Sequence, residues 1–273
     1  MKFTIALDVF NKAPTIEALL RSWLDNLSGK HEIELLITFD ALRDQSAVIA
    51  SQVIDEYPEV AARFMFTNDI FEIKCDNLML QDATGDVVCF VQDDNSQYDP
   101  NWDATLADVM TSTPNIGAVG LLSGVRMHRN FDLDRMECYR PHKDERAWVH
   151  GINKDAYPLG VYQVDVINRP FAIGVDLLRS YGGLDESYCP MDYDDADLSF
   201  KLLRDGYTNL YVPFDLLNIC AKKETLSQAT IAENYMRGER IAKSRWSQFI
   251  AARESSVKFL YPMEASSEGL SVR

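Results

Sequence analysis

The sequence predicts an α/β fold built on a doubly wound, mostly parallel central sheet, and three observations lead to this prediction. Short apolar segments alternate with segments of helical periodicity through roughly the first 120 residues, as in parallel sheets with right-handed helical crossovers. The apolar segment at 87–91 has no polar interruption, as expected for a strand buried on both faces. Acidic and amide residues follow three of the strands, at the edge where such sheets bind ligands.

The elements of the first half follow in order along the chain. Residues 2–7 are rich in strand formers, and from Pro14 the apolar side chains recur at helical spacing. The later helices end near Pro58 and Gly85. We expect strands at 2–7, 32–39, 63–66, 87–91 and 116–121, and helices at 14–27, 43–56, 71–83 and 102–113.

The second half is less regular. From residue 122 to about residue 157 the periodicity fails and the charge rises, which predicts a long excursion. Helical patterning returns from about Ser227 to the end of the 240s, and we expect the last ten or so residues to be frayed. The predicted fold is therefore an α/β domain with a C-terminal helical extension.

The composition restricts the possible partners and location. A formal net charge of −15 repels phosphate backbones, so we expect no nucleic-acid partner. A nucleotide diphosphate still fits, because a metal ion can mask carboxylate charge locally. No stretch approaches ~18 apolar residues, so no transmembrane segment is expected. Five cysteines without a CxxC pair favour reduced thiols in a cytoplasmic protein.

Acidic and amide side chains stand after three strands that should be neighbours. Asp8 follows the first strand, Asp40 the second, and residues 92–95 (QDDN) the central strand. Asp40 by itself is explained equally well by a turn or a helix cap. The adjacent carboxylates at 93 and 94 repel each other, and a hard divalent cation with oxygen ligands would relieve that repulsion. The alternative for this group is a solvated acidic loop.

A second acidic cluster lies at residues 191–198 (MDYDDADL), at the start of a predicted helix that Gly206 ends. The helix dipole favours acids in a first turn, and Asp194 with Asp197 resembles a capping pair. This explains two of the four acids. A carboxylate at a helix start that faces a cleft is also a natural general base. Upstream, the glycine pair at 182–183 predicts a tight turn.

Together these segments resemble glycosyltransferase family 2, whose members have the GT-A fold, over roughly residues 2–220. IALDVFNKAPTIEALLRSW is similar to the family's first strand and helix, and ITFD to its second strand. CFVQDDNSQYDPNW resembles the strand that carries the family's DXD metal motif. YGGLDESYCPMDYDDADLSFKLLRDGY resembles its GGxDE turn and the ED-x-D/E helix start. The last pair of motifs, with its spacing to the DXD segment, is the most specific signal.

The resemblance implies a domain organisation and an activity. Residues 1–225 would form the GT-A domain, a Rossmann-like sheet with a nucleotide-binding half at 1–121 and an acceptor-binding half at 122–225. Residues 226–273 would form the helical tail. The implied reaction moves a sugar from a nucleotide-diphospho-sugar, a UDP-sugar by default, onto the hydroxyl of a glycan, lipid-linked or other acceptor. A membrane-bound acceptor would bring the chain to a membrane surface, and the implied setting is polysaccharide or glycan biosynthesis.

The resemblance also implies roles for individual residues. Asp195 would be the catalytic base, and Asp194, in the place of the usual Glu, would position acceptor or base. Asp94 would hold Mn²⁺ or Mg²⁺ against the diphosphate. With one base and one metal on opposite faces of the sugar, single displacement and hence inversion is expected. The residues expected to contact the nucleotide donor are Asp8, Phe10, Asp40, Asp93 and Lys222.

Two departures from the family pattern keep alternatives open. The first DXD position is Gln92, and Cys220 lies near the place where many members have a metal-binding His. Cys is a poor ligand for hard Mg²⁺. The main alternative is therefore a catalytically inactive GT-A module that binds a nucleotide-sugar or glycan. A sugar nucleotidyltransferase is less favoured, because the segment DVFNKAPT after the first strand contains no glycine.

Basic and aromatic residues of the second half have two interpretations each. The basic residues between 122 and 157 either recognise acceptor or diphosphate, or form a solvated loop paired with nearby acids. Trp148 is a candidate for stacking on a sugar, whereas Trp102 fits the apolar stripe of its helix. In the tail, basic residues at helical spacing predict a solvated face, with a lid or partner surface as the alternative; these are Arg237, Arg240, Lys243 and Arg245.

Overall fold

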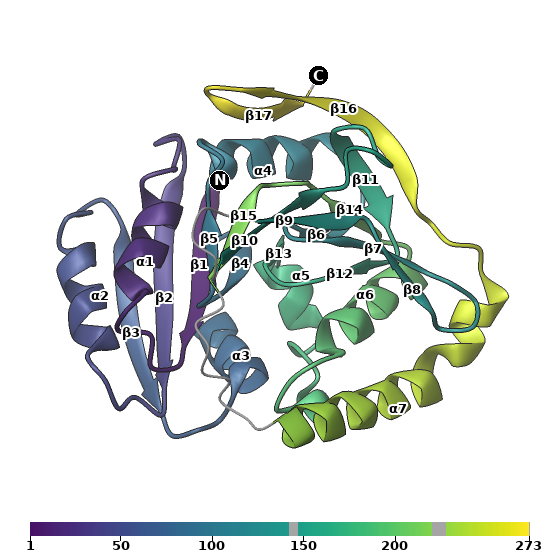
Figure 1. The fold of residues 1–273 in the computed structure, drawn as a ribbon, viewed down its shortest axis with the longest axis horizontal. Coiled ribbons are helices and arrows are strands. Elements are labelled where there is room, and N and C mark those ends of the chain that lie inside the picture. Colours follow the sequence, from purple (N-terminus) through teal and green to yellow (C-terminus); the bar gives the residue numbers. More distant parts are fainter. Residues whose placement is uncertain (142–146, 220–227, 273) are drawn as a thin grey trace.

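A ten-stranded sheet with helices on both faces forms the centre of the computed structural model, which describes residues 1–141, 147–219 and 228–272 (Figure 1). All of its strands run in one direction except β11, β13 and β17. The predicted mostly parallel α/β sheet is thus confirmed. In spatial order the strands are β17 (Gly269–Val272), β16 (Lys258–Ser266), β11 (Gly160–Val164), β14 (Thr208–Tyr211), β6 (Ile116–Gly120), β13 (Phe171–Gly174), β4 (Val87–Gln92), β1 (Lys2–Val9), β2 (Glu32–Asp40) and β3 (Ala61–Thr67).

The strand side chains alternate between two hydrophobic cores. Phe3, Ile5 and Leu7 of β1 belong to one core, and Ala6 between them belongs to the other. Because successive side chains of a strand face opposite sides, both faces of the sheet need a helical cover. The first face is covered by α1 (Ile16–Leu24), α2 (Ser46–Ile54) and α4 (Trp102–Ser112), and the second by α3 (Glu72–Asp82), α5 (Val175–Ser180) and α6 (Asp194–Arg204).

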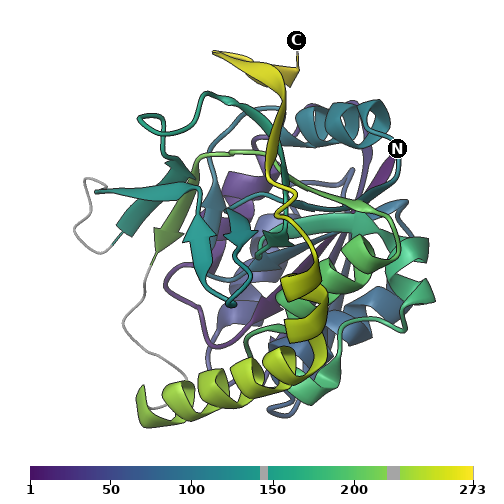
Figure 2. The ribbon, with the colours of Figure 1, turned by 90° about the vertical axis from the view of Figure 1, so that its right-hand side faces the viewer.

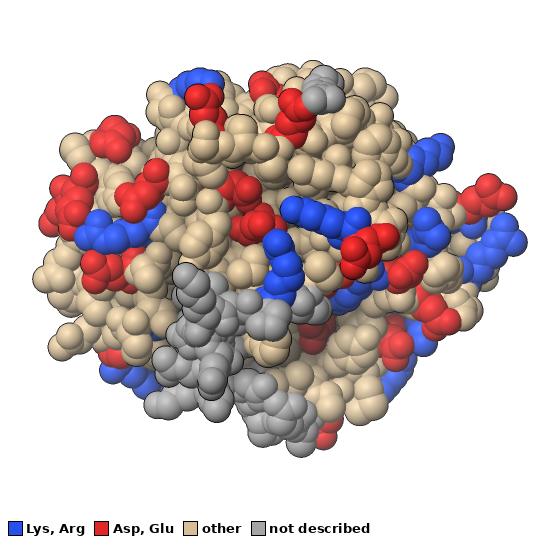
Figure 3. Space-filling view, turned by 45° about the horizontal axis from the view of Figure 1, so that its top comes forward, with Lys and Arg blue, Asp and Glu red and all other residues tan. Residues whose placement is uncertain are grey.

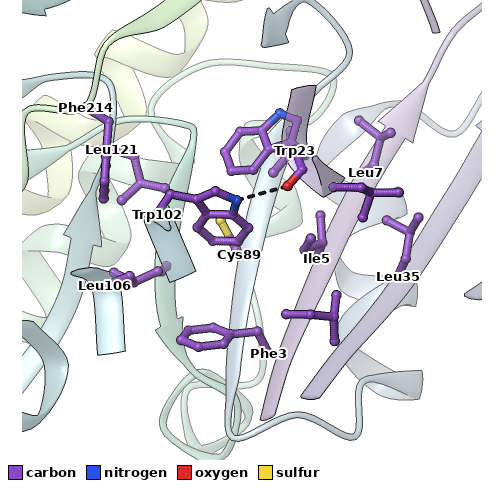
Figure 4. Close-up of a cluster of buried hydrophobic side chains, with 14 of the residues drawn as sticks. Phe3, Ile5, Leu7, Trp23, Leu35, Cys89, Trp102, Leu106, Leu121 and Phe214 are labelled. Atoms are coloured by element: carbon purple, nitrogen blue, oxygen red, sulfur yellow. Dashed lines mark hydrogen bonds between the residues drawn. The ribbon is translucent and has the colours of Figure 1, made fainter. Parts of the chain in front are cut away.

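Two tryptophans pack together in the first core (Figure 4). Trp102 is fully buried, its indole N–H donates to the carbonyl of Trp23 at 3.0 Å, and the two rings meet edge to face at 5.0 Å. The indole N–H of Trp23 in turn donates to the carbonyl of Asn95 at 2.8 Å. The core therefore holds the segment that follows β4. The expectation that Trp102 belongs to the core is confirmed.

The excursion predicted from 122 to 157 consists largely of short strands, which the sequence did not indicate. In β7, Val125 and Met127 are buried and the intervening Arg126 is not, so the side chains alternate with a period of two. The strand is too short for this alternation to be recognised in the sequence among the charged residues. Two small sheets result. One contains β5 (Asn95–Gln97), β15 (Leu216–Ile219), β10 (Ala147–Ile152) and β9 (Glu137–Pro141), and the other β12 (Val166–Ile167), β7 (Gly124–Met127) and β8 (Leu133–Arg135).

The C-terminal part contains both a helix and a strand hairpin. The helix α7 (Gln228–Ala252) confirms the predicted helical extension, and Figure 2 shows the chain passing from it to the hairpin on the opposite side. The expectation of a frayed end was wrong, because β16 pairs with β11 and extends the central sheet. Met263 and Leu270 of this hairpin are buried in the first core. The burial of these two apolar side chains stabilises the ordered conformation of the C-terminal end.

Charged side chains of both signs occupy one face of the molecule. On the face in Figure 3, Lys and Arg side chains lie beside Asp and Glu. Within the described ranges, no helix combines the length and apolar character that a membrane crossing requires. The four cysteines at 75, 89, 138 and 189 are free thiols, and Cys220 lies outside the described residues.

The Trp102→Ala variant should lower the free energy of unfolding by about 3–5 kcal/mol, because it leaves a cavity and an unpaired carbonyl in the core. Urea unfolding followed by circular dichroism measures this change. Trp148→Ala, the same substitution at a side chain that is 42% exposed, is the control and should cost about 1 kcal/mol or less. Equal costs for the two variants would contradict the assigned role of Trp102.

Candidate active site

Two adjoining cavities open at the carboxyl ends of the parallel strands. The strand-end cavity, of about 200 Å³, is bounded by the ends of β1, β2 and β4. The α6 cavity, of about 300 Å³, is bounded by the first turn of α6 and by β7 and β8. Glu72, Gln92 and Met191 line both, so the two cavities form one cleft. This is the edge of the sheet at which the sequence predicted a ligand.

Asp93 joins the loop after β1 to the end of β4. Its carboxylate accepts a hydrogen bond from the backbone N–H of Phe10 at 2.9 Å and pairs with the Lys12 ammonium at 3.0 Å. Burial raises the pKa of Asp93, and Lys12 opposes that shift. Asp93 and Phe10 both line the strand-end cavity. Lys12 was not among the predicted site residues, although its place just after the first strand was visible in the sequence.

Asp8 lies at the end of β1 in the most acidic part of the cleft. Its Oδ1 is buried and accepts no hydrogen bond from the described residues. Burial, followed by the charges of Asp93, Asp76 and Glu72, raises the pKa of Asp8 well above its ordinary value. A cation bound nearby would lower the cost of ionising this group.

Asp40 lines the strand-end cavity, but its carboxylate already accepts hydrogen bonds from other residues of the chain. It accepts hydrogen bonds from Thr67 Oγ1 at 2.8 Å and from the backbone N–H groups of Ile70 and Phe71 at 3.0 and 2.8 Å. These contacts close the turn between β3 and α3. They match the turn interpretation that the sequence left open for Asp40.

Asp94 is the predicted metal ligand and lies on the wall of the strand-end cavity. Its carboxylate accepts a hydrogen bond from Asn95 at 2.7 Å, and burial raises the pKa of Asp94. Among the residues that the structure describes, no three His, Cys, Asp or Glu side chains converge as a ligand set. The donor chemistry nevertheless fits a hard cation, because a carboxylate here would bind it together with the oxygens of a diphosphate.

Gln92 occupies the place of the first acid of the DXD motif. Its side-chain amide donates to Glu72 Oε1 at 3.0 Å and its carbonyl accepts from Asn95 at 3.3 Å. Gln92 therefore joins the end of β4 to the start of α3.

Asp195 lies in the first turn of α6 and lines the α6 cavity. One carboxylate oxygen accepts from the side-chain amide of Asn168 at 2.7 Å, and the other from the backbone N–H of Ala196 at 2.7 Å. Asn168 is held in turn by Ser123 Oγ, which donates to its carbonyl at 2.7 Å. Burial and the charge of Asp194 raise the pKa of Asp195 to about 6, while Arg169 and the two hydrogen bonds oppose that shift.

Arg169 lies in the wall of the α6 cavity and is buried among three carboxylates. Its guanidinium lies 2.7 Å from Asp194, 2.8 Å from Asp76 and 3.6 Å from Glu72, and its side chain is only 7% exposed. Burial and the neighbouring acids raise the pKa of Asp76 and Glu72, and Arg169 opposes both shifts. Asp194 is thus a buried counter-ion. Neither Arg169 nor Asn168 was predicted, since an isolated Asn-Arg pair before a strand carries no chemical motif.

The interpretation of Asp194 and Asp197 as a capping pair was wrong. The residue that caps α6 is Tyr193, and its side chain makes no capping hydrogen bond. Asp197 instead accepts a hydrogen bond from the Trp246 indole at 2.7 Å and pairs with Lys201 at 2.7 Å. The carboxylate of Asp197 is thus bound by Trp246 of α7, which is remote in sequence, and does not cap α6.

The basic residues of the tail are divided between docking and solvent. Arg245 pairs with Asp185 at 2.7 Å, and Arg237 donates to backbone carbonyls of the η1 turn (Glu186–Tyr188) and its flank. The solvated-face prediction was therefore wrong for Arg237, whereas Arg245 is paired but remains 38% exposed. Lys243 pairs with Glu239 of its own helix at 2.9 Å.

The remaining candidates are placed as follows. Arg135 of the excursion lines the α6 cavity, whereas Arg140 pairs with Asp215 at 2.6 Å. Gly182 and Gly183 both have positive φ, of 80° and 89°, as the predicted tight turn requires. Lys222 lies outside the described residues.

A comparison with known families identifies the family of the chain. Residues 4–159, more than half of the chain, match the model of glycosyl transferase family 2. No curated protein matches.

Solved structures resemble the chain in fold at low identity. A mannosyltransferase from Pyrobaculum calidifontis, PcManGT, in complex with GDP-Man and Mn²⁺, aligns with a TM-score of 0.55 and 19% identity over 78% of this chain and 54% of its own. GalNAc-T7 with UDP, GalNAc and Mn²⁺ aligns with a TM-score of 0.66 and 14% identity over 92% of this chain and 50% of its own. S. aureus TarS 1-349 with UDP gives 0.55 and 14% over 92% and 70%.

This chain spans about half the length of the first two of these structures. From the family match, and from the fold that it shares with these structures, the chain belongs to glycosyl transferase family 2 and has the GT-A fold.

Proposed function

We propose that the chain transfers a sugar from a nucleotide-diphospho-sugar to an acceptor hydroxyl, with inversion and with metal assistance. The observation that carries this proposal is the single cleft, in which Asp94 and Asp195 line cavities that share a wall. The donor would occupy the strand-end cavity and the acceptor the α6 cavity. The nucleotides in the structures of the similar proteins, UDP in two and GDP-Man in one, support a nucleotide-sugar donor and favour UDP as the first to test.

The donor side of the cleft needs positive charge, because a diphosphate would enter a cavity lined by Asp8, Asp93 and Asp94. Asp94 would hold Mn²⁺ or Mg²⁺, and the bound ion would supply positive charge beside the leaving diphosphate. Lys12 already offsets Asp93. Phe10 and the backbone near Asp40 would border the nucleoside, and Lys222 would be a further cation for the leaving group.

On the acceptor side, Asp195 would accept the proton of the acceptor hydroxyl. The acceptor oxygen then forms a bond to the anomeric carbon while the bond from that carbon to the diphosphate oxygen breaks. Asn168 orients the Asp195 carboxylate at 2.7 Å. Asp194 contributes indirectly, because its ion pair with Arg169 at 2.7 Å holds the first turn of α6 against the floor of the cleft.

We also propose a division of the chain into donor, acceptor and C-terminal parts. We retain residues 1–121 as the donor half, 122–225 as the acceptor half and 226–273 as a C-terminal extension. That extension contains a helix and a hairpin, and the hairpin adds to the sheet.

One observation favours the inactive binding module as the second candidate. Gln92 stands where an acid would help to bind metal, and its amide is engaged by Glu72 and Asn95. Such a module would bind a nucleotide-sugar without releasing the nucleotide, so the release of UDP from UDP-sugars in the presence of Mn²⁺ distinguishes the two candidates.

UDP should raise the melting temperature of the wild type only when Mn²⁺ or Mg²⁺ is present, because bare diphosphate is repelled by the acidic cavity. Asp94→Ala should abolish this metal-dependent shift in a thermal-shift assay. Asp55→Ala, at an exposed site on the edge of α2, is the matched control and should leave the shift intact. An unchanged shift in Asp94→Ala would remove Asp94 from the metal site.

Asp195→Asn should keep the UDP-dependent thermal shift and lose sugar transfer by about 10²–10⁴-fold, because the amide cannot accept the acceptor proton. The measurement is the release of UDP from a panel of UDP-sugars with a pool of glycans as acceptors. Full activity in this variant would exclude Asp195 as the base.

The rate of transfer should fall as the pH drops below about 6, because the pKa of Asp195 is about 6 and only its ionised form accepts a proton. Asn168→Ala removes a hydrogen bond that lowers this pKa, so the acidic limb of the pH–rate profile should move to higher pH. Asn130→Ala, at an exposed turn, should leave the limb in place. A limb that does not move in Asn168→Ala contradicts the positioning role.

A further inference from the structure

The helix α7 supplies a wall of the α6 cavity. Tyr235 of this helix lines the cavity together with Asp195 and Tyr193. The helix lies beyond the residues matched by the family model, which ends at 159. In Figure 1 it crosses below α6, so a segment late in the sequence lies beside the start of that helix.

Specific contacts fix α7 in this position. Arg237 donates to the carbonyls of Ser187 at 3.2 Å and Tyr188 at 3.1 Å, and also to that of Cys189. Trp246 donates to Asp197 at 2.7 Å. The helix is therefore held to both the η1 turn and α6, and the position of its side chains along the cavity is set.

A glycine lets α7 approach the turn before α6 very closely. A Cβ atom at Gly238 would lie 3.0 Å from Cδ2 of Tyr193 and 3.4 Å from the carbonyl oxygen of Asp192. Tyr193 has a φ of 69°, in the left-handed region, and directly precedes Asp194 and Asp195. The close approach brings the helix against the turn that presents Asp195.

Two tyrosine rings meet at this contact. The rings of Tyr193 and Tyr235 lie 5.2 Å apart between centroids, with 56° between their planes. Tyr235 is 44% exposed, so the hydrophobic core does not account for its position. Aromatic rings that are apolar on their faces and polar at the tip are well suited to binding amphipathic ligands.

The cavity has an apolar part and a polar part. Val125, Met127 and Val166 line the apolar part, and all three are buried residues of β7 and β12. The polar part contains Asp195 with Asn168 and further polar and charged side chains, which are Glu72, Gln92, Arg135, Arg169, Asp192 and Asp194. A pyranose ring has the same division, since its C–H bonds form apolar faces and its hydroxyls lie around the edge. An alkyl chain would desolvate the polar part of the cavity without hydrogen bonding to it.

We propose that Tyr193 and Tyr235 form an aromatic subsite that binds a pyranose ring of the acceptor and directs one of its hydroxyls toward Asp195. This inference rests on the proposed glycosyl transfer and names the acceptor class as a carbohydrate. It makes α7 a determinant of acceptor binding rather than a structural appendage.

The test measures binding of methyl α- and β-pyranosides of glucose, galactose, mannose and N-acetylglucosamine to the full chain with UDP and Mn²⁺, by saturation-transfer NMR and titration. At least one pyranoside should bind the wild type. Tyr235→Ala should weaken that binding by about tenfold or more, whereas Tyr235→Phe should restore it because the ring face is kept. Met236→Ala changes the neighbouring residue, which is 53% exposed, and should bind as the wild type does.

The thermal shift with UDP and Mn²⁺ separates the two possible failures. Its absence in the wild type would overturn the proposed function. If the shift is normal, three results would overturn the aromatic subsite alone. The first is that no pyranoside binds, and the second is that decyl phosphate binds instead. The third is that Tyr235→Ala binds the pyranoside as tightly as the wild type does. Unaltered melting temperatures in the Tyr235 variants would show that the change in binding does not come from unfolding.

Discussion

The buried ion-pair cluster around Arg169 is the interaction on which the rest of the cleft depends. One guanidinium compensates Asp194 of α6 and Asp76 and Glu72 of α3, so it joins two helices that are far apart in the chain. Removing one partner of a buried ion pair typically costs about 3–5 kcal/mol, because the other charge is left without compensation. Here the loss would leave three acids uncompensated. The cluster therefore fixes the first turn of α6 in the position from which Asp195 reaches the cleft.

The cleft as a whole combines an excess of acid with a shortage of cations. Burial raises the pKa of Asp8, Asp93 and Asp94 in the strand-end cavity, and Lys12 offsets only part of that charge. The proposed diphosphate would bind there only together with a cation. In the α6 cavity the balance is different, because Asn168 donates a neutral hydrogen bond to Asp195, and its pKa of about 6 suits the proposed base. The two cavities share one wall but differ in electrostatics. The carboxylates of the strand-end cavity are only partly compensated by Lys12, whereas Asp195 in the α6 cavity is hydrogen-bonded by a neutral amide.

The extension after the second half contributes to both stability and the site. The hairpin β16–β17 buries Met263 and Leu270 and adds to the central sheet, while α7 attaches to α6 through Trp246 and Asp197. Without a contact to α7, the carboxylate of Asp197 would lack its indole donor. The acid that looked like a local cap is therefore part of a long-range contact, and this explains why the cluster contains more acids than a helix start requires.

Sequence patterns were enough to predict the alternating strands and helices, the acidic residues at the ends of β1, β2 and β4, and the acids in the first turn of α6. These features are local, since each depends on periodicity or on residues within one turn or strand. The groups that meet Asp195 and Asp194 could be found only in the folded chain, because Asn168 and Arg169 reach them across 27 and 25 positions of chain and no spacing rule describes such contacts. The tertiary structure also decided that the last residues are ordered and that Tyr235 reaches the cleft. Those outcomes depend on apolar surface and hydrogen-bond donors that become available only when distant segments pack together.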